Sequence, residues 1–157
     1  MTTRFASLLI ALSALLLLGL AGCSDEQSAP TSGEPIAVDP FDANVVYFGT
    51  QQDGLWATDD AWATSRQVFE GTGRKGAEML TVAVAAVEQV DGRSRHVYAG
   101  RIGEGVYESR DGGQTFELID GSPTDPHRIA ISGSGKLYVA DWGKGIWRYD
   151  VASGKAD

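Results

Sequence analysis

The segment SRDGGQTF, residues 109–116, places one carboxylate, Asp111, between two hydroxyl side chains, Ser109 and Thr115. A carboxylate in that setting could act as a catalytic group or as a calcium ligand. It could instead accept hydrogen bonds from the backbone N–H groups of its own turn, as Asp side chains often do. Two adjacent glycines tolerate positive φ and favour a turn. We therefore expect Asp111 to hold a turn together rather than to act on a substrate.

The spacing of these residues matches the Asp-box, or BNR, pattern S-x-D-x-G-x-T-F, in which the aromatic ring tucks beneath a hairpin. The pattern assigns a structural role to Ser109, Asp111, Gly113, Thr115 and Phe116. A partial copy lies 51 residues upstream and contains Thr58, Asp60 and Thr64, with Trp62 standing where Gly113 does. A partial copy in register makes the pattern more specific than a single match would be.

Three segments of the chain repeat one pattern: VVYFGTQQDGLW (45–56), HVYAGRIGEGVY (96–107) and KLYVADWGKGIW (136–147). In each copy a tyrosine is third, a glycine is tenth and an aromatic residue is twelfth. Short β-prone runs on either side of a glycine-containing loop predict a hairpin. A repeat of 40 to 51 residues built from short strands is typical of β-propeller blades. We expect the repeated aromatic residues to pack in the core: Tyr47, Tyr98, Tyr138, Trp56, Tyr107 and Trp147.

The sequence thus predicts an all-β fold of four-stranded propeller blades, at about 36–70, 78–120 and 127–157. The expected strands are 36–39, 45–50, 54–58 and 66–69, then 80–88, 96–100, 105–109 and 115–119, then 127–131, 136–140 and 145–149. The chain ends before a convincing fourth strand of the third blade. About two and a half to three blades are fewer than the four to eight of a closed ring. A truncated reading frame, a ring completed by another chain and a small open sheet structure all remain open.

The N-terminal part of the sequence predicts a lipoprotein signal. Arg4 is the only charge before Cys23, and an apolar run from Phe5 to Leu20 lies between them, too short for a typical membrane-spanning helix. The run ends in LAGC, which resembles a bacterial lipobox. We therefore expect residues 1–22 to be a signal peptide and Cys23 to be acylated. An ordinary secretory signal is the alternative.

The predicted lipid anchor implies a bacterial cell-envelope location. Residues 23–35 are polar and contain proline, so they predict a flexible tether between the lipid and a folded part over 36–157. Ser24 stands where an Asp would favour retention in the inner membrane, so an outer-membrane location is favoured. The expected partners are the bilayer, through acylated Cys23, a polysaccharide ligand, and further blades or another chain that completes the ring.

Composition excludes several classes of function. The chain contains 13 Lys and Arg residues and 21 Asp and Glu residues. The resulting net charge of −8 argues against sequence-independent nucleic-acid binding. A single cysteine excludes an intramolecular disulfide and a cysteine-based zinc cluster. The two histidines, His96 and His127, are 31 residues apart and form no ligand pattern. The sequence therefore indicates neither a metal site nor a cofactor.

The motifs resemble one family more than the others. Asp39-Pro40, Tyr47-Phe48-Gly49-Thr50, Gly54-Leu55-Trp56 and Pro126-His127-Arg128 are similar to interior blades of the first propeller of family 74 glycoside hydrolases. The resemblance implies propeller enzymes that cleave xyloglucan and related β-1,4-glucans in a cleft between two seven-bladed propellers. Their two catalytic aspartates fall in regions that this chain lacks, so the resemblance gives no catalytic residue here. The Asp-box alone also occurs in sialidases, in sortilin-type receptors and in photosystem assembly factors.

This resemblance predicts a fragment related to those hydrolases, anchored in the envelope and non-catalytic by itself; a glycan- or protein-binding module is the alternative. In an antiparallel blade, the loops after the second and fourth strands emerge on one face, which is the candidate ligand face. It includes the loops 71–78 and 120–127 and the residues Trp142, Asp141, Glu104, Arg101, Asp53 and His127. Trp142 could stack on a sugar ring or pack within its loop. Asp53 and Glu104 hold equivalent positions, but the sequence does not fix the carboxyl separation of about 6.5–9.5 Å that inverting hydrolysis needs.

Overall fold

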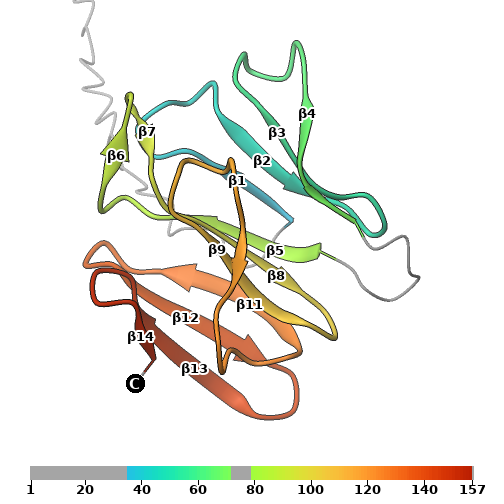
Figure 1. Ribbon diagram of the computed structural model, residues 1–157, viewed down its shortest axis with the longest axis vertical. Helices are drawn as coiled ribbons and strands as arrows, with labels where there is room; N and C mark the ends of the chain where they lie inside the picture. The colour runs from blue at the N-terminus through green and yellow to red at the C-terminus, as the bar shows by residue number, and fades with distance from the viewer. Residues whose placement is uncertain (1–34, 72–78, 157) are drawn as a thin grey trace, which may run out of the picture.

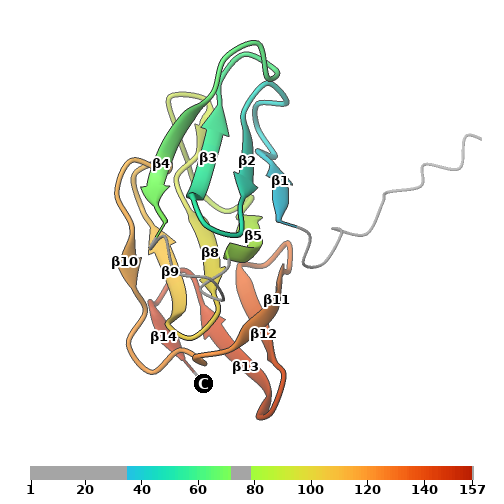
Figure 2. The same cartoon turned by 90° about the vertical axis from the view of Figure 1, so that its right-hand side faces the viewer.

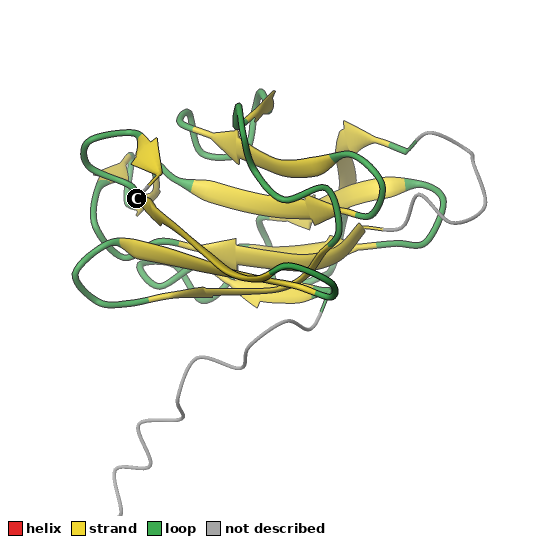
Figure 3. Ribbon diagram, turned by 90° about the horizontal axis from the view of Figure 1, so that it is seen from below, coloured by secondary structure: helices red, strands yellow, loops and turns green. Residues whose placement is uncertain are grey.

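The computed structural model describes residues 35–71 and 79–156. In these residues all regular structure is β-strand (Figure 3). Three antiparallel sheets of four strands follow one another along the chain (Figure 1). The first sheet contains β1 (Ile36–Val38), β2 (Val46–Gly49), β3 (Gly54–Thr58) and β4 (Arg66–Glu70), in that spatial order. The prediction of four-stranded propeller-type blades is confirmed.

The other two sheets repeat this arrangement. The second sheet contains β5 (Met79–Val84), β8 (Val97–Arg101), β9 (Gly105–Ser109) and β10 (Glu117–Leu118). The third sheet contains β11 (Pro126–Ile131), β12 (Lys136–Asp141), β13 (Gly145–Asp150) and β14 (Lys155–Ala156). A small hairpin of β6 (Gln89–Val90) and β7 (Arg93–Ser94) interrupts the second repeat.

Two expectations about the strands are wrong. The strand expected over 80–88 ends at Val84, and the chain then turns into the β6–β7 hairpin, where Asp91 and Gly92 both have positive φ. The third sheet does have a fourth strand, because β14 pairs with β13 through Tyr149–Ala156 and Asp150–Lys155. Its two residues form too short a run to show any apolar pattern in the sequence.

The first strands of the three sheets lie side by side. β5 contacts β1 on one side and β11 on the other, and each of the three is an edge strand of its own sheet (Figure 2). Their side chains line a shallow apolar groove that includes Ala37, Val82 and Ile129. In a propeller the innermost strands surround the central axis in this way, so the groove marks the axial side of the molecule.

Two apolar clusters hold the sheets against one another. Tyr47 and Leu55 of the first sheet pack on Val97 and Ala99 of the second. The opposite face of the second sheet packs on the third, through a cluster that includes Tyr98, Val106, Leu137, Val139 and Tyr149. Because successive residues of a strand point to opposite faces, the middle sheet is apolar on both sides.

The expected packing of the repeated aromatic residues in the core holds for four of the six. Tyr47 and Tyr98 are buried, Trp147 packs against the second cluster, and Tyr107 packs on Phe69. Trp56 is only partly buried and pairs with Phe48 on the face of the first sheet opposite Tyr47, and Tyr138 is 39% exposed. Tyr138 lies on the face of the third sheet that no other sheet of the described chain covers.

We predict that Leu137→Ala, which opens a cavity between the second and third sheets, lowers the free energy of unfolding by about 2–5 kcal/mol. Urea denaturation of the two proteins measures the difference. Leu118→Ala is the matched control because Leu118 is 50% exposed, and it should change stability by less than about 0.5 kcal/mol. Equal losses in the two variants would contradict this assignment of the core.

Candidate functional site

The carboxylate of Asp111 is engaged on both oxygens within the turn from Ser109 to Phe116, the Asp111 turn. Ser109 Oγ donates a hydrogen bond to Asp111 Oδ1 at 2.8 Å and accepts one from the Gly113 N–H at 2.8 Å. Thr115 donates from its N–H to Oδ1 at 2.9 Å and from its hydroxyl to Oδ2 at 2.6 Å. The Gln114 N–H is a fourth donor, and the third to Oδ1, at 3.0 Å. These contacts give the carboxylate a role in holding the turn.

The turn that contains Asp60 makes the same contacts in the first sheet. Thr58 Oγ1 donates to Asp60 Oδ1 at 2.8 Å and accepts from the Trp62 N–H at 2.9 Å. Thr64 donates from its N–H to Oδ1 at 2.8 Å and from its hydroxyl to Oδ2 at 2.7 Å. Trp62 takes the place of Gly113 and keeps a positive φ of 76°, which L-residues rarely adopt. The hydrogen bonds, not glycine, therefore fix this backbone.

Both carboxylates are stabilised in the ionised form. Partial burial of Asp111 opposes ionisation, but the hydrogen bonds from Thr115, Ser109 and Gln114 outweigh it and lower the pKa to about 2. Hydrogen bonds from Thr64 and Thr58 likewise lower the pKa of Asp60. A carboxylate with a lowered pKa is a poor proton donor near neutral pH.

The Asp111 turn also joins the first two sheets. The Tyr47 hydroxyl donates to the Gly112 carbonyl at 3.1 Å, and burial raises the pKa of Tyr47 to about 12. A Cβ atom on Gly113 would lie 2.7 Å from Cε1 of Tyr47, so glycine is required for this contact. Beneath the same turn, the rings of Phe116 and Phe69 stack with their centroids 5.1 Å apart.

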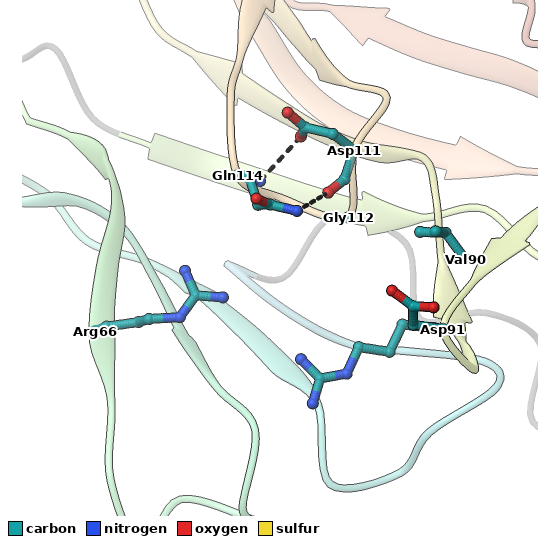
Figure 4. A pocket seen from close by; sticks show the side chains of 7 residues that line it. Arg66, Val90, Asp91, Asp111, Gly112 and Gln114 are labelled. Carbon is teal, nitrogen blue, oxygen red and sulfur yellow. Dashed lines mark hydrogen bonds between the residues drawn. The ribbon is translucent and has the colours of Figure 1, made fainter.

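A polar pocket opens between this turn and the first sheet (Figure 4). Arg66, Asp91 and Gln114 line it, and the Gln114 side chain donates to the Asp111 carbonyl at 2.9 Å. Arg93 also lines the pocket and pairs with Asp59 at 3.0 Å. The sequence did not indicate this pocket, because its residues come from three separate turns and strands.

On the candidate ligand face, the structure brings Trp142 and His127 together. Their ring centroids are 4.5 Å apart, and the planes are tilted by 44°. Trp142 is nevertheless 78% exposed, so one side of its indole ring is available to solvent. His127 Nε2 lies 3.6 Å from Asp125 Oδ1. The two rings come from the β12–β13 loop and from β11, which the third sheet places next to each other.

Asp141, at the start of the same loop, is turned inward. Its Oδ1 accepts hydrogen bonds from the N–H groups of Gly143 and Lys144, both at 2.9 Å, and the bond from Gly143 is the main cause of its lowered pKa. Thr50, at the equivalent position of the first repeat, accepts from the Asp53 N–H at 3.0 Å. This position therefore caps the loop in two of the three repeats, while Asp53 itself is exposed.

Arg101, at the same position of the second repeat, is buried between two sheets. Its guanidinium lies over the ring of Phe69, with Cζ 4.3 Å from the ring centroid, and donates to Glu104 Oε2 at 3.1 Å. Tyr107 donates to the same Glu104 oxygen at 2.6 Å. Arg101 and Glu104 thus form part of the contact between the first and second sheets. Of the candidate ligand residues, Trp142 and Asp53 are exposed, His127 and Glu104 are partly buried, and Arg101 and Asp141 are buried.

A hollow lies beside the Trp142 loop and combines residues of the predicted 120–127 loop with Lys144 and with Ile146, which the sequence did not single out. Ser122 and Pro123 line one side, and Lys144 and Ile146 line the other. Ile146, in β13, is 78% exposed. The sequence repeat does not show which face of this strand is exposed, because that depends on which sheets of the described chain lie next to it.

A buried polar cluster between the second and third sheets was also missed. The Glu108 carboxylate accepts hydrogen bonds from Tyr98 at 2.6 Å, from Tyr149 at 3.1 Å and from Arg110 at 2.8 Å. Burial raises the pKa of the Tyr98 hydroxyl. His96 Nδ1 lies 3.5 Å from the same carboxylate. A lone Glu in an alternating strand gave no sign that it would meet three donors.

Some expectations lie outside the described residues: Cys23, the signal peptide, most of the tether and the loop 72–78. Within 35–71 and 79–156, no three His, Cys, Asp or Glu side chains gather closely enough to hold a metal ion. The same residues contain no helix long and apolar enough to cross a membrane.

The chain is similar in sequence to xyloglucanases. It is 29% identical to a xyloglucanase of Paenibacillus sp over 141 residues, which cover 78% of this chain and 14% of that protein. It is 26% identical to a xyloglucanase of Hypocrea jecorina over 155 residues, which cover 78% of this chain and 18% of that protein. No protein-family model matches the chain.

Solved structures give the same relationship. The family 74 xyloglucanase of Xanthomonas campestris superposes with a TM-score of 0.67 at 25% identity, over 80% of this chain and 22% of that one. The family 74 enzyme of Niastella koreensis also gives 0.67, at 26% identity, over 79% of this chain and 20% of that one. The chain is therefore a set of β-propeller blades. It is homologous in sequence and structure to family 74 xyloglucanases, and spans less than a quarter of their length.

We predict that Asp111→Asn lowers the melting temperature at pH 7 by several degrees, because the ionised carboxylate is the acceptor in the turn. Since the pKa of Asp111 is about 2 in the fold and near 3.8 ordinarily, its stabilising effect is complete only above about pH 5. The effect is lost as the pH falls toward 2, so the melting temperatures of the unmodified chain and the Asp111 variant should converge at that pH. A difference that stays constant between pH 7 and pH 2 would refute this role.

Proposed function

We propose that this chain is an envelope-anchored, carbohydrate-binding set of propeller blades that does not cleave glycosidic bonds by itself. The homology to xyloglucanases supports a β-glucan of the xyloglucan type as the ligand. The single structural observation that carries the proposal is the exposed Trp142 ring, supported from behind by His127.

Trp142 fits a sugar better than it fits a small apolar ligand. Its open side is a flat apolar surface suited to the C–H face of a pyranose ring. Lys144 and Ser122 line the adjacent hollow, where they could meet hydroxyl groups. The ring contact with His127 supports one side of the indole, which reduces the conformational entropy that Trp142 loses on binding.

The carboxylates argue against hydrolysis by these blades alone. Glycoside hydrolysis needs a general acid whose pKa is raised, together with a second carboxylate. The pKa values of Asp60, Asp111 and Asp141 are instead lowered by backbone and hydroxyl donors. Glu104 accepts hydrogen bonds from Tyr107 and Arg101 between two sheets. These groups are occupied in holding the fold.

We predict that Trp142→Ala weakens binding of xyloglucan oligosaccharides at least about tenfold, the loss expected for a central aromatic contact. Isothermal titration calorimetry measures the affinity. Phe41→Ala is the control, because this exposed aromatic residue follows β1 and lies on the opposite side of the blades. Unchanged affinity in the Trp142 variant would exclude Trp142 as the sugar-binding surface. Release of reducing sugars by the unmodified chain would exclude the proposal that the blades do not cleave glycosidic bonds by themselves.

The anchor is a separate part of the proposal. The sequence LAGC at residues 20–23 supports cleavage before Cys23 and acylation of its thiol. Ser24 favours an outer-membrane location for the anchored protein. We predict that Cys23→Ser abolishes incorporation of labelled palmitate and moves the protein from the membrane fraction to the soluble fraction. Ser24→Ala is the control and should remain acylated. Equal labelling of the Cys23 variant and the unmodified chain would refute acylation at Cys23.

A second candidate is that the blades belong to a longer lipid-anchored hydrolase of the xyloglucanase type. The short share of the relatives that this chain covers, 14% and 18%, favours it. The genomic DNA beyond the Asp157 codon should then encode further blades in the same frame. An authentic stop codon, with a folded product of 157 residues, would exclude this candidate.

A further inference from the structure

The third sheet exposes a face that its two predecessors bury. In the first two repeats, Tyr47 and Tyr98 point toward the following sheet and are covered by it. Tyr138 holds the same position in the third repeat and points the same way, but it is exposed. Ile146, which pairs with Ala140 on this face, is the most exposed aliphatic side chain of the described residues. We name this face, with Tyr138 and Ile146, the leading face.

The first sheet exposes the complementary face. Phe48 corresponds to Ala99 and Val139, which are both fully buried against the preceding sheet. Phe48 is 36% exposed, and Val38, on the same side of the sheet, is 54% exposed. Trp62 lies edge-on to Phe48, with the ring centroids 6.1 Å apart. We name this face, with Val38, Phe48 and Trp62, the trailing face.

The chain thus carries both halves of one kind of interface, one at each end of the stack of sheets. We propose that two copies of this chain associate head to tail, so that the leading face of each covers the trailing face of the other. Two copies supply six sheets, a number within the four to eight of closed propellers. A closed arrangement leaves neither face exposed, and it repeats contacts that the chain already makes twice internally.

Charge favours this pairing over contacts between identical faces. Arg148 pairs directly with Tyr138 on the leading face, and Arg128 pairs with Ala140 on the same face. Two leading faces in contact would bring these guanidinium groups near their own copies, and like charges disfavour such a pairing. In the described residues, the trailing side carries no such pair of arginines: its turn contains Asp60, which keeps its negative charge within the hydrogen bonds of that turn. The equivalent Asp111 turn lies over Tyr47 in the internal interface.

The bulky Trp62 is compatible with this contact. Trp62 occupies the position that Gly113 holds in the contact with Tyr47, between the first and second sheets. The contact between the second and third sheets has no glycine at the equivalent position and uses larger aromatic rings instead. In that interface the ring of Tyr98 packs edge-on against Tyr149, with the centroids 6.4 Å apart. We expect Trp62 of one copy to pack on Tyr138 of the other in the same manner.

The test uses the full chain in mild detergent, with sedimentation velocity as the measurement. The unmodified chain should sediment as a dimer. Phe48→Asp, in the trailing face, and Ile146→Asp, in the leading face, should each sediment as monomers. An equimolar mixture of the two variants should regain dimers, because such a pair retains one interface in which both faces are unmodified.

Leu118→Asp is the matched control, since Leu118 is exposed and lies in neither face, and it should remain a dimer. Circular dichroism establishes that each variant is folded. The proposal would be overturned if the unmodified chain sediments as a monomer, which is the result expected if another polypeptide covers these faces. A dimer that withstands either single substitution would also overturn it, because that dimer would use identical faces or the N-terminal segment.

Discussion

The fold depends on one constraint, the mutual burial of neighbouring sheets. A four-stranded sheet with apolar residues on both faces cannot remain open to water, so each sheet must be covered by the next. Here Tyr47, Leu55 and Val97 form the first contact, and Tyr98, Leu137 and Val139 form the second. The loops that carry Trp142 and the other surface candidates have defined positions only because these contacts fix the sheets that hold them.

Local turns adapt to this constraint in different ways. Gly113 allows the Tyr47 ring to approach the backbone of the second sheet, and the tyrosine hydroxyl then reaches the Gly112 carbonyl. The second contact instead buries the Glu108 carboxylate with Tyr98 and Tyr149 as donors. A buried carboxylate is costly unless such donors accompany it. The same repeated pattern therefore forms a mainly apolar contact between the first and second sheets and a contact with a buried polar cluster between the second and third.

Much of the fold could be predicted from the sequence, because glycine and aromatic residues recur at fixed spacing. That spacing gave the hairpins, and the order of the motifs gave the relationship to xyloglucanases. The exposure of Tyr138 could not be predicted, since the repeat alone does not say which copy lacks a neighbour. Arg101 was assigned to the ligand face, but its long side chain reaches back over Phe69 instead. Its conformation depends on a sheet distant in sequence.

The capping of the β12–β13 loop by Asp141 has a consequence for how this surface can change during evolution. The carboxylate fixes the backbone of Gly143 and Lys144 from a buried position, while the Trp142 side chain is 78% exposed. Substitutions at position 142 can therefore alter what the loop recognises without disturbing its shape. Specificity and stability are encoded by adjacent residues that selection can act on separately.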